Sequence, residues 1–123
     1  GDVDGAVAAY REAVRLDPAY ALAYHSLGDA LYKKGDPDGA IAAHREAVRL
    51  DPDDLAAHCK LGVLLCQRGR FAEALPLLRR GHELGSKRPG WPYPSAQWVA
   101  DCERALAAQQ ARTAPPPREV WPR

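Results

Sequence analysis

Cysteine and histidine are the residues of this chain whose chemistry could make a metal site, a nucleophile or an acid-base pair. The three cysteines, Cys59, Cys66 and Cys102, form no CxxC pair and have no histidine nearby at the spacing of metal ligands. Their odd number also disfavours a disulfide framework. We therefore predict that they are small buried hydrophobic residues, and that the chain holds no metal and no cofactor.

The histidines are spread over the chain and form no Ser/His/Asp or Cys/His arrangement visible in the sequence: His25, His44, His58 and His82. The sequence also contains no glycine-rich phosphate loop, no HRD and no DFG motif. We therefore predict no catalytic residues, and we do not expect an enzyme.

The composition indicates packed helices and disfavours a nucleic-acid partner. Alanine is frequent, Phe occurs once and Met is absent, so the core must consist of small side chains that let backbones approach closely. Lys plus Arg total 17 against 16 for Asp plus Glu, which leaves no broad positive field for a phosphate backbone. An RNA-binding helical repeat is therefore disfavoured.

The apolar residues are too scattered for a membrane span or a secretory signal. No run of about 18 apolar residues occurs, and no charged start leads into an apolar stretch and a cleavage site. We expect a soluble protein located in the cytoplasm. Because the chain starts without Met at Gly1, inside the repeat described next, we also expect further sequence upstream.

An internal repeat organises most of the chain. Residues 4–18 read DGAVAAYREAVRLDP and residues 38–52 read DGAIAAHREAVRLDP, which are identical at 13 of 15 positions with an offset of 34. A repeat of this length is typical of stacked helix hairpins, each of which buries its apolar face against its neighbours.

The residues at fixed places in this period resemble those of the tetratricopeptide repeat family. The family pattern is matched in residues 21–54 by Tyr24, Leu27, Gly28, Leu31, Ala40, Ala47 and Pro52. It is matched in residues 55–88 by His58, Leu61, Gly62, Leu65, Ala74 and Gly81, with Ser86 where Pro is expected. Residues 1–20 match only its second half. The resemblance covers about 88 of 123 residues.

This resemblance implies an all-α fold, a right-handed solenoid of antiparallel helix hairpins that ends in a capping helix. His44 and His58 replace Tyr10 and Tyr24 at equivalent repeat positions, so both are interpreted as packing substitutions. The expected organisation is a repeat array at 1–88 (a truncated repeat at 1–20, full repeats at 21–54 and 55–88), a proline-rich loop at 89–94, a capping helix at 95–111 and a disordered tail at 112–123.

Local signals place the helices within the repeats. Each Asp-Pro pair, at 17–18, 36–37 and 51–52, offers a side-chain acceptor followed by Pro and is predicted to begin a helix. Gly28 and Gly62 are predicted to lie where the two helices of a hairpin cross, opposite Ala40 and Ala74. The predicted helices are 3–16, 18–33, 37–50, 52–68 and 71–84, with a kink but no break at Pro76.

The composition changes after Leu84, where the segment GSKRPGWPYPS cannot continue a helix. Trp91 and Tyr93 are expected to dock on the last hairpin, because bare linkers rarely carry such large apolar side chains. Ser95 is expected to cap a helix over 96–111 that covers the last repeat. From Arg112 onward, including Pro115 to Pro117, no periodicity remains and we expect disorder.

Residues 79–106 also resemble the closing segment of tetratricopeptide regions at the C-terminal end of large bacterial serine/threonine protein kinases. This resemblance implies that the chain is the appendage of a signalling kinase whose catalytic domain is absent from it. The alternative function is therefore a regulatory or oligomerising segment of such a kinase.

The leading prediction is a scaffold that binds a peptide or partner protein, without nucleic acid or membrane. The family resemblance implies a concave groove lined by the first helix of each pair, and self-association through the truncated first repeat is a further expectation. We expect the groove to be mildly positive and to prefer acidic residues beside an apolar anchor. A chaperone-type carboxylate clamp is not expected, because Ser26 and Ala56 occupy positions where Asn and Lys are required. The predicted partner-binding residues are Leu22, His25, Ser26, Asp29, Tyr32, Lys33, Lys60, Val63 and Gln67.

Overall fold

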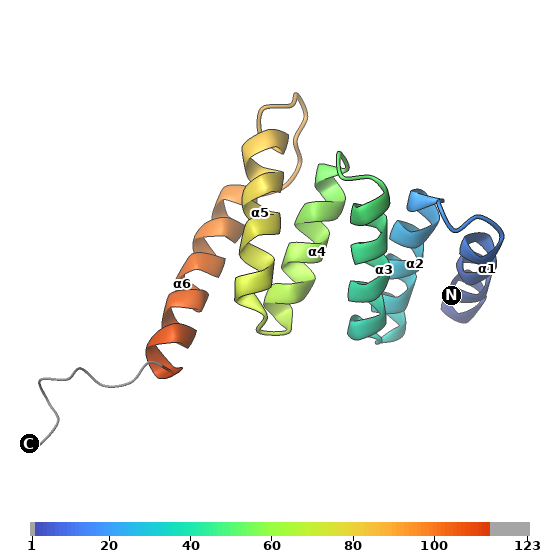
Figure 1. Ribbon diagram of the computed structural model, residues 1–123, viewed down its shortest axis with the longest axis horizontal. Coiled ribbons are helices and arrows are strands. Elements are labelled where there is room, and N and C mark those ends of the chain that lie inside the picture. The colour runs from blue at the N-terminus through green and yellow to red at the C-terminus, as the bar shows by residue number, and fades with distance from the viewer. Residues whose placement is uncertain (1, 114–123) are drawn as a thin grey trace, which may run out of the picture.

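The computed structural model describes residues 2–113, and within them the chain forms six α-helices and no strand. The helices stand side by side in chain order, and successive helices run in opposite directions (Figure 1). None of the helices in this part of the chain is long and apolar enough to cross a membrane. The helices are α1 (Val3–Leu16), α2 (Ala21–Lys34), α3 (Pro37–Leu50), α4 (Leu55–Gln67), α5 (Phe71–Gly85) and α6 (Ser95–Thr113).

Two tight hairpins, α2–α3 and α4–α5, form the centre of the stack. Gly35 and Gly69 turn the chain within them, with φ of 92° and 73°, a left-handed conformation that favours glycine. The helix α1 packs on α2, and α6 packs on α5. The prediction of an all-α helical-repeat fold is therefore confirmed.

The Asp-Pro pairs serve two different purposes. Asp36 is the N-cap of α3, and its carboxylate accepts the backbone N–H of Gly39 at 2.9 Å, as predicted. The prediction was wrong for Asp17 and Asp51, which end α1 and α3 instead, each donating its N–H to a carbonyl of the preceding turn. Their carboxylates accept N–H groups two residues later, which forms a turn before the next helix starts. Consequently α2 and α4 begin three residues later than predicted.

Small residues hold the hairpins together. A Cβ atom added to Gly28 would lie 2.6 Å from the His44 ring, and one added to Gly62 would lie 2.7 Å from Cδ2 of Leu78. Both glycines therefore lie at helix crossings, as predicted, but their closest partners are His44 and Leu78 rather than Ala40 and Ala74. Positions 44 and 78 are themselves separated by the repeat length of 34, so the two hairpins use the same crossing.

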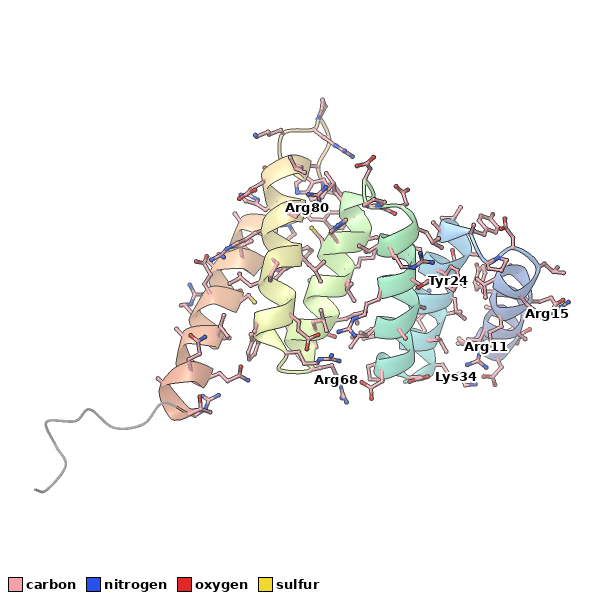
Figure 2. All side chains as sticks on the ribbon, viewed as in Figure 1. Arg11, Arg15, Tyr24, Lys34, Arg68 and Arg80 are labelled. Carbon is pink, nitrogen blue, oxygen red and sulfur yellow. The ribbon has the colours of Figure 1, made fainter. Side chains whose placement is uncertain are left out.

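Charged side chains cover the outside of the stack, as Figure 2 shows for Arg11 and Arg15 on α1. Arg15 pairs with Glu12 and Arg49 pairs with Glu46, one helical turn apart in each case. These pairs are solvent-exposed and contribute little to stability.

The segment after α5 is docked on the last hairpin. The Trp91 ring packs against Gly85, where an added Cβ would lie 2.3 Å from it. Ser95 was predicted to cap α6, but it is the first residue of that helix and is only 2% exposed. The helix continues to Thr113, so Arg112 and Thr113 are not part of a disordered tail. The rest of that prediction, including Pro115 to Pro117, lies outside the described residues.

The helix α5 runs through Pro76 without a break. Proline removes one hydrogen bond from the helix interior, and that cost is tolerated here because α5 is packed against helices on both sides.

We predict that Gly62→Leu destabilises the protein by about 1–3 kcal/mol or more, because Leu78 is fully buried and cannot move aside. Ala42→Leu, on the exposed face of α3, is the matched control and should change stability by less than about 0.5 kcal/mol. Urea unfolding followed by circular dichroism measures both. Equal midpoints for the two variants would show that the crossing is looser than this structure implies.

Candidate functional site

A groove of about 380 Å³ lies between α2, α4 and the start of α6. The first helix of each hairpin supplies two of its sides, and the loop before α6 supplies Tyr93 at one end. Its surface is mostly apolar, with charged atoms gathered at one side. We call it the inner groove. It is lined by Asp29, Tyr32, His44, Lys60, Val63, Leu64, Gln67, Tyr93 and Trp98.

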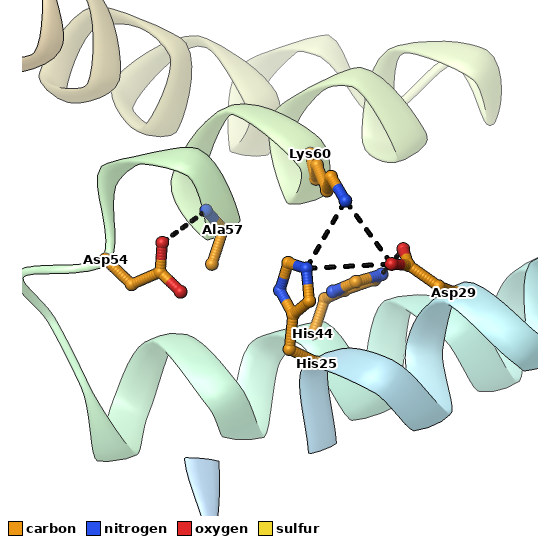
Figure 3. Close-up of polar contacts among 6 residues, drawn as sticks. All are labelled: His25, Asp29, His44, Asp54, Ala57 and Lys60. Atoms are coloured by element: carbon orange, nitrogen blue, oxygen red, sulfur yellow. Dashed lines mark hydrogen bonds and ion pairs between the residues drawn. The ribbon is translucent and has the colours of Figure 1, made fainter. Parts of the chain in front are cut away.

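A cluster of charged and polar side chains forms one wall of the inner groove (Figure 3). Nζ of Lys60 donates to Oδ2 of Asp29 at 3.3 Å and lies 3.3 Å from Nε2 of His25. Nε2 of His44 lies 3.5 Å from the other carboxylate oxygen of Asp29. The Asp29 carboxylate is therefore surrounded by three nitrogen-bearing side chains from three helices.

Burial controls the charge of this cluster. His44 is 1% exposed, and burial, with the nearby His25 as a smaller cause, lowers its pKa to about 4. The two imidazole rings pack edge to face at 5.1 Å, and their Nδ1 atoms are buried and make no hydrogen bond within the described structure. His44 is therefore neutral at neutral pH, and the principal ion pair is the one between Lys60 and Asp29.

Aromatic side chains form the opposite wall. Tyr93 lies between Trp91 and Trp98, with ring centroids 5.1 Å and 5.8 Å away. The buried Ser95 hydroxyl holds this arrangement in place, because it accepts the indole N–H of Trp91 at 3.0 Å and lies 2.8 Å from Nδ1 of His82. The aromatic wall is thus built on a hydrogen-bonded loop.

The structure brings five of the nine predicted partner-binding residues to the inner groove: Asp29, Tyr32, Lys60, Val63 and Gln67. His25 lies behind them, in contact with Lys60 and Asp29. Ser26 and Lys33 line a separate hollow of about 330 Å³ between α1 and α2, together with Tyr10. Leu22 is 63% exposed and lines neither hollow.

The sequence analysis missed four residues of the inner groove: His44, Leu64, Tyr93 and Trp98. A signal existed for Trp98, which follows Leu64 by one repeat length of 34 residues. His44 was correctly interpreted as a packing residue, since it fills the crossing at Gly28, but its imidazole edge also reaches the groove. The described residues contain no group of three or more His, Cys, Asp or Glu side chains suited to a metal ion.

Comparison with protein families identifies the repeat. A sequence profile described as "TPR repeat" matches residues 1–35, and one described as "Tetratricopeptide repeat" matches residues 25–89, more than half of the chain. The chain belongs to the tetratricopeptide repeat family. A comparison with curated protein sequences finds no match.

Several solved structures share this tetratricopeptide fold. The type III secretion translocator chaperone SycD of Yersinia enterocolitica superposes with a TM-score of 0.76 and 21% identity, over 89% of this chain and 76% of that one. The TPR2B domain of yeast Sti1 gives 0.66 and 24% identity, over 88% and 85%, and MamA gives 0.68 and 24%, over 92% and 70%. At these identities the likeness shows the fold alone.

The buried His44 predicts a dependence of stability on pH. Its pKa is lowered from 6.5 to about 4 in the folded state, so the unfolded chain takes up a proton that the folded chain does not. Its contribution is fully present above pH 6.5 and is lost as the pH falls towards 4, which amounts to about 3 kcal/mol. His44→Leu, which copies Leu78 of the next repeat, should abolish this loss.

Urea midpoints at pH 7.5, 5.5 and 4.5 measure the difference between parent and His44→Leu. Acidic residues titrate in both proteins and cancel in the comparison. Parallel pH profiles would contradict a neutral, buried His44.

Proposed function

We propose that this protein is a non-enzymatic scaffold that binds an extended segment of a partner protein in the inner groove. The observation that carries the proposal is a partly open, largely apolar groove on the first helices of the tetratricopeptide hairpins, closed at one end by aromatic side chains. Apolar concave sites with a few placed polar groups are typical of binding sites.

Structural relatives support this kind of function. SycD has been solved in complex with a peptide of the translocator YopD, at 21% identity and a TM-score of 0.76 over 83% of that chain. The TPR2B domain of yeast Sti1 has been solved in a complex described as TPR2B-domain:pHsp70. Proteins of this fold therefore bind other proteins or their peptides, and we extend that role to this chain.

The chemistry of the groove favours an apolar anchor in the bound segment. Tyr32, Val63 and Trp98 offer apolar surface to a side chain entering the groove. Lys60 is already paired with Asp29, so a carboxylate of the partner must compete for it. The bound segment should therefore insert an aliphatic or aromatic side chain. Acidic residues beside it should add little, and this proposal replaces the preference for acidic residues that we expected from the sequence. Because the groove is small, micromolar affinity is expected.

A second hypothesis follows from the resemblance of residues 79–106 to the C-terminal regions of bacterial serine/threonine kinases. In that case the groove would serve regulation or assembly of an attached kinase, and kinase motifs in the sequence upstream of Gly1 would support it. Self-association through α1 and a location in the cytoplasm also stay predictions, which sedimentation and cell fractionation would test.

The inner groove can be tested with two exposed tyrosines of nearly equal exposure. Tyr32 is 47% exposed and lines the groove, whereas Tyr20 is 45% exposed and lies at the turn before α2, outside it. We predict that Tyr32→Ala weakens binding of peptides selected from a random library by about tenfold, and that Tyr20→Ala leaves it unchanged.

Fluorescence anisotropy of labelled peptides gives both dissociation constants. The selected peptides should share an apolar residue whose replacement by Ala weakens binding. Binding that responds to Tyr20→Ala and not to Tyr32→Ala would place the site elsewhere on the molecule.

A further inference from the structure

Two of the three cysteines line a second hollow of about 260 Å³ between α4, α5 and α6. Cys66 is the penultimate residue of α4, and Cys102 lies in the middle of α6. The two residues are separated by 36 positions in the sequence, and the packing of α6 beside α4 brings them to the same hollow. Neither is used by the proposed peptide site.

The Cys66 and Cys102 side chains differ in their exposure to solvent. Cys66 is half-buried and faces the hollow, whereas Cys102 is 2% exposed and its thiol donates to the carbonyl oxygen of Phe71 at 3.5 Å. Cys59 provides the contrast within the same chain: it is fully buried, and its sulfur packs against Gly81. A thiol that faces a hollow can form a mixed disulfide, and a second thiol lining the same hollow can then resolve it.

We propose that Cys66 and Cys102 form a redox-active pair, which a low-molecular-weight disulfide oxidises to a disulfide bond between α4 and α6. The odd number of cysteines argued against a disulfide framework, but it does not exclude one pair with Cys59 left over. The hollow beside Cys66 gives the oxidant access to that sulfur.

The reaction balances with oxidised glutathione as the oxidant. The Cys66 thiol loses its proton and attacks one sulfur of oxidised glutathione, which forms a mixed disulfide and releases one glutathione thiolate. The Cys102 thiol then loses its proton and attacks the Cys66 sulfur, releasing the second glutathione thiolate. Both thiolates take up the two protons, so two protein thiols are oxidised while one glutathione disulfide is reduced to two thiols.

The surroundings of Cys66 determine how fast this happens. Burial, and next the hydrogen bond with Cys102, raise the pKa of the Cys66 thiol to about 12. Because only the thiolate attacks, oxidation is slow at neutral pH and its rate rises about tenfold for each unit of pH between 7 and 10.

Oxidation also bears on the inner groove, a consequence that rests on the proposed function. Val63 on α4 and Trp98 on α6 line both the hollow and the groove, each one helical turn before one of the two cysteines. A disulfide bond between Cys66 and Cys102 therefore holds α4 and α6 at a fixed distance, and with them the groove residues Val63 and Trp98.

The experiment is peptide mapping of the native protein after incubation with oxidised glutathione at pH 8.5. Trypsin places each cysteine on its own peptide: residues 50–60 carry Cys59, residues 61–68 carry Cys66 and residues 88–104 carry Cys102. We expect a linked pair of 61–68 with 88–104 that a reductant separates. The same incubation in urea is the control, where the selectivity for this pair should disappear.

Variants make the outcome specific. Cys59→Ala should keep the linked pair, Cys66→Ala should abolish it, and Cys102→Ala should leave glutathione attached to Cys66. The oxidised parent should also unfold at a higher temperature than the reduced parent. Linkage through Cys59, or a native protein whose Cys66 stays free or glutathione-bound, would overturn the proposal. These readouts involve no peptide ligand, so they are independent of whether the inner groove binds one.

Discussion

Close contact between the two helices of each hairpin is the constraint on which the rest of the structure depends. At Gly28 and Gly62 the missing side chain lets the partner helix insert His44 and Leu78. Because these residues fill the crossing, the neighbouring core can be built from alanine, with Ala40 and Ala74 completely buried. The two hairpins pack on each other through α3 and α4, and Lys60 on α4 reaches Asp29 on α2. The His44 ring, which fills the crossing at Gly28, lies against the same carboxylate, so the glycine crossing also contributes to the groove wall.

The sequence predicted the parts of the fold that depend on the repeat period. The bounds of α1 and α3 agree with the prediction, because the same run of residues occurs in both and their caps are local. The starts of α2 and α4 were misplaced, since an Asp-Pro pair suits both the start of a helix and the turn after one. Only the hydrogen bonds of Asp17 and Asp51 distinguish the two cases.

The candidate site was predictable only where it follows the repeat. Asp29 and Val63 occupy equivalent positions one period apart, and both line the groove. Tyr93 belongs to no repeat, and its place depends on a tertiary hydrogen bond network around Ser95 that no local pattern reveals. His44 was recognised as a packing residue, but its second contact, with Asp29 on another helix, depends on how deeply its ring enters the crossing.

Two histidines flank the carboxylate that pairs with Lys60 in the inner groove. Asp29 alone would be a mobile surface carboxylate that a partner's acidic group could displace from Lys60. Here Nε2 of His25 lies 3.6 Å from one of its oxygens and Nε2 of His44 lies 3.5 Å from the other, so an imidazole ring flanks the carboxylate on each side. A carboxylate of the partner that binds Lys60 must compete with Asp29 for it. Because Asp29 stays beside Lys60, the two carboxylates then repel each other at close range. We therefore expect the proposed binding to depend on the apolar wall, where Trp98 and Val63 offer surface without an electrostatic penalty.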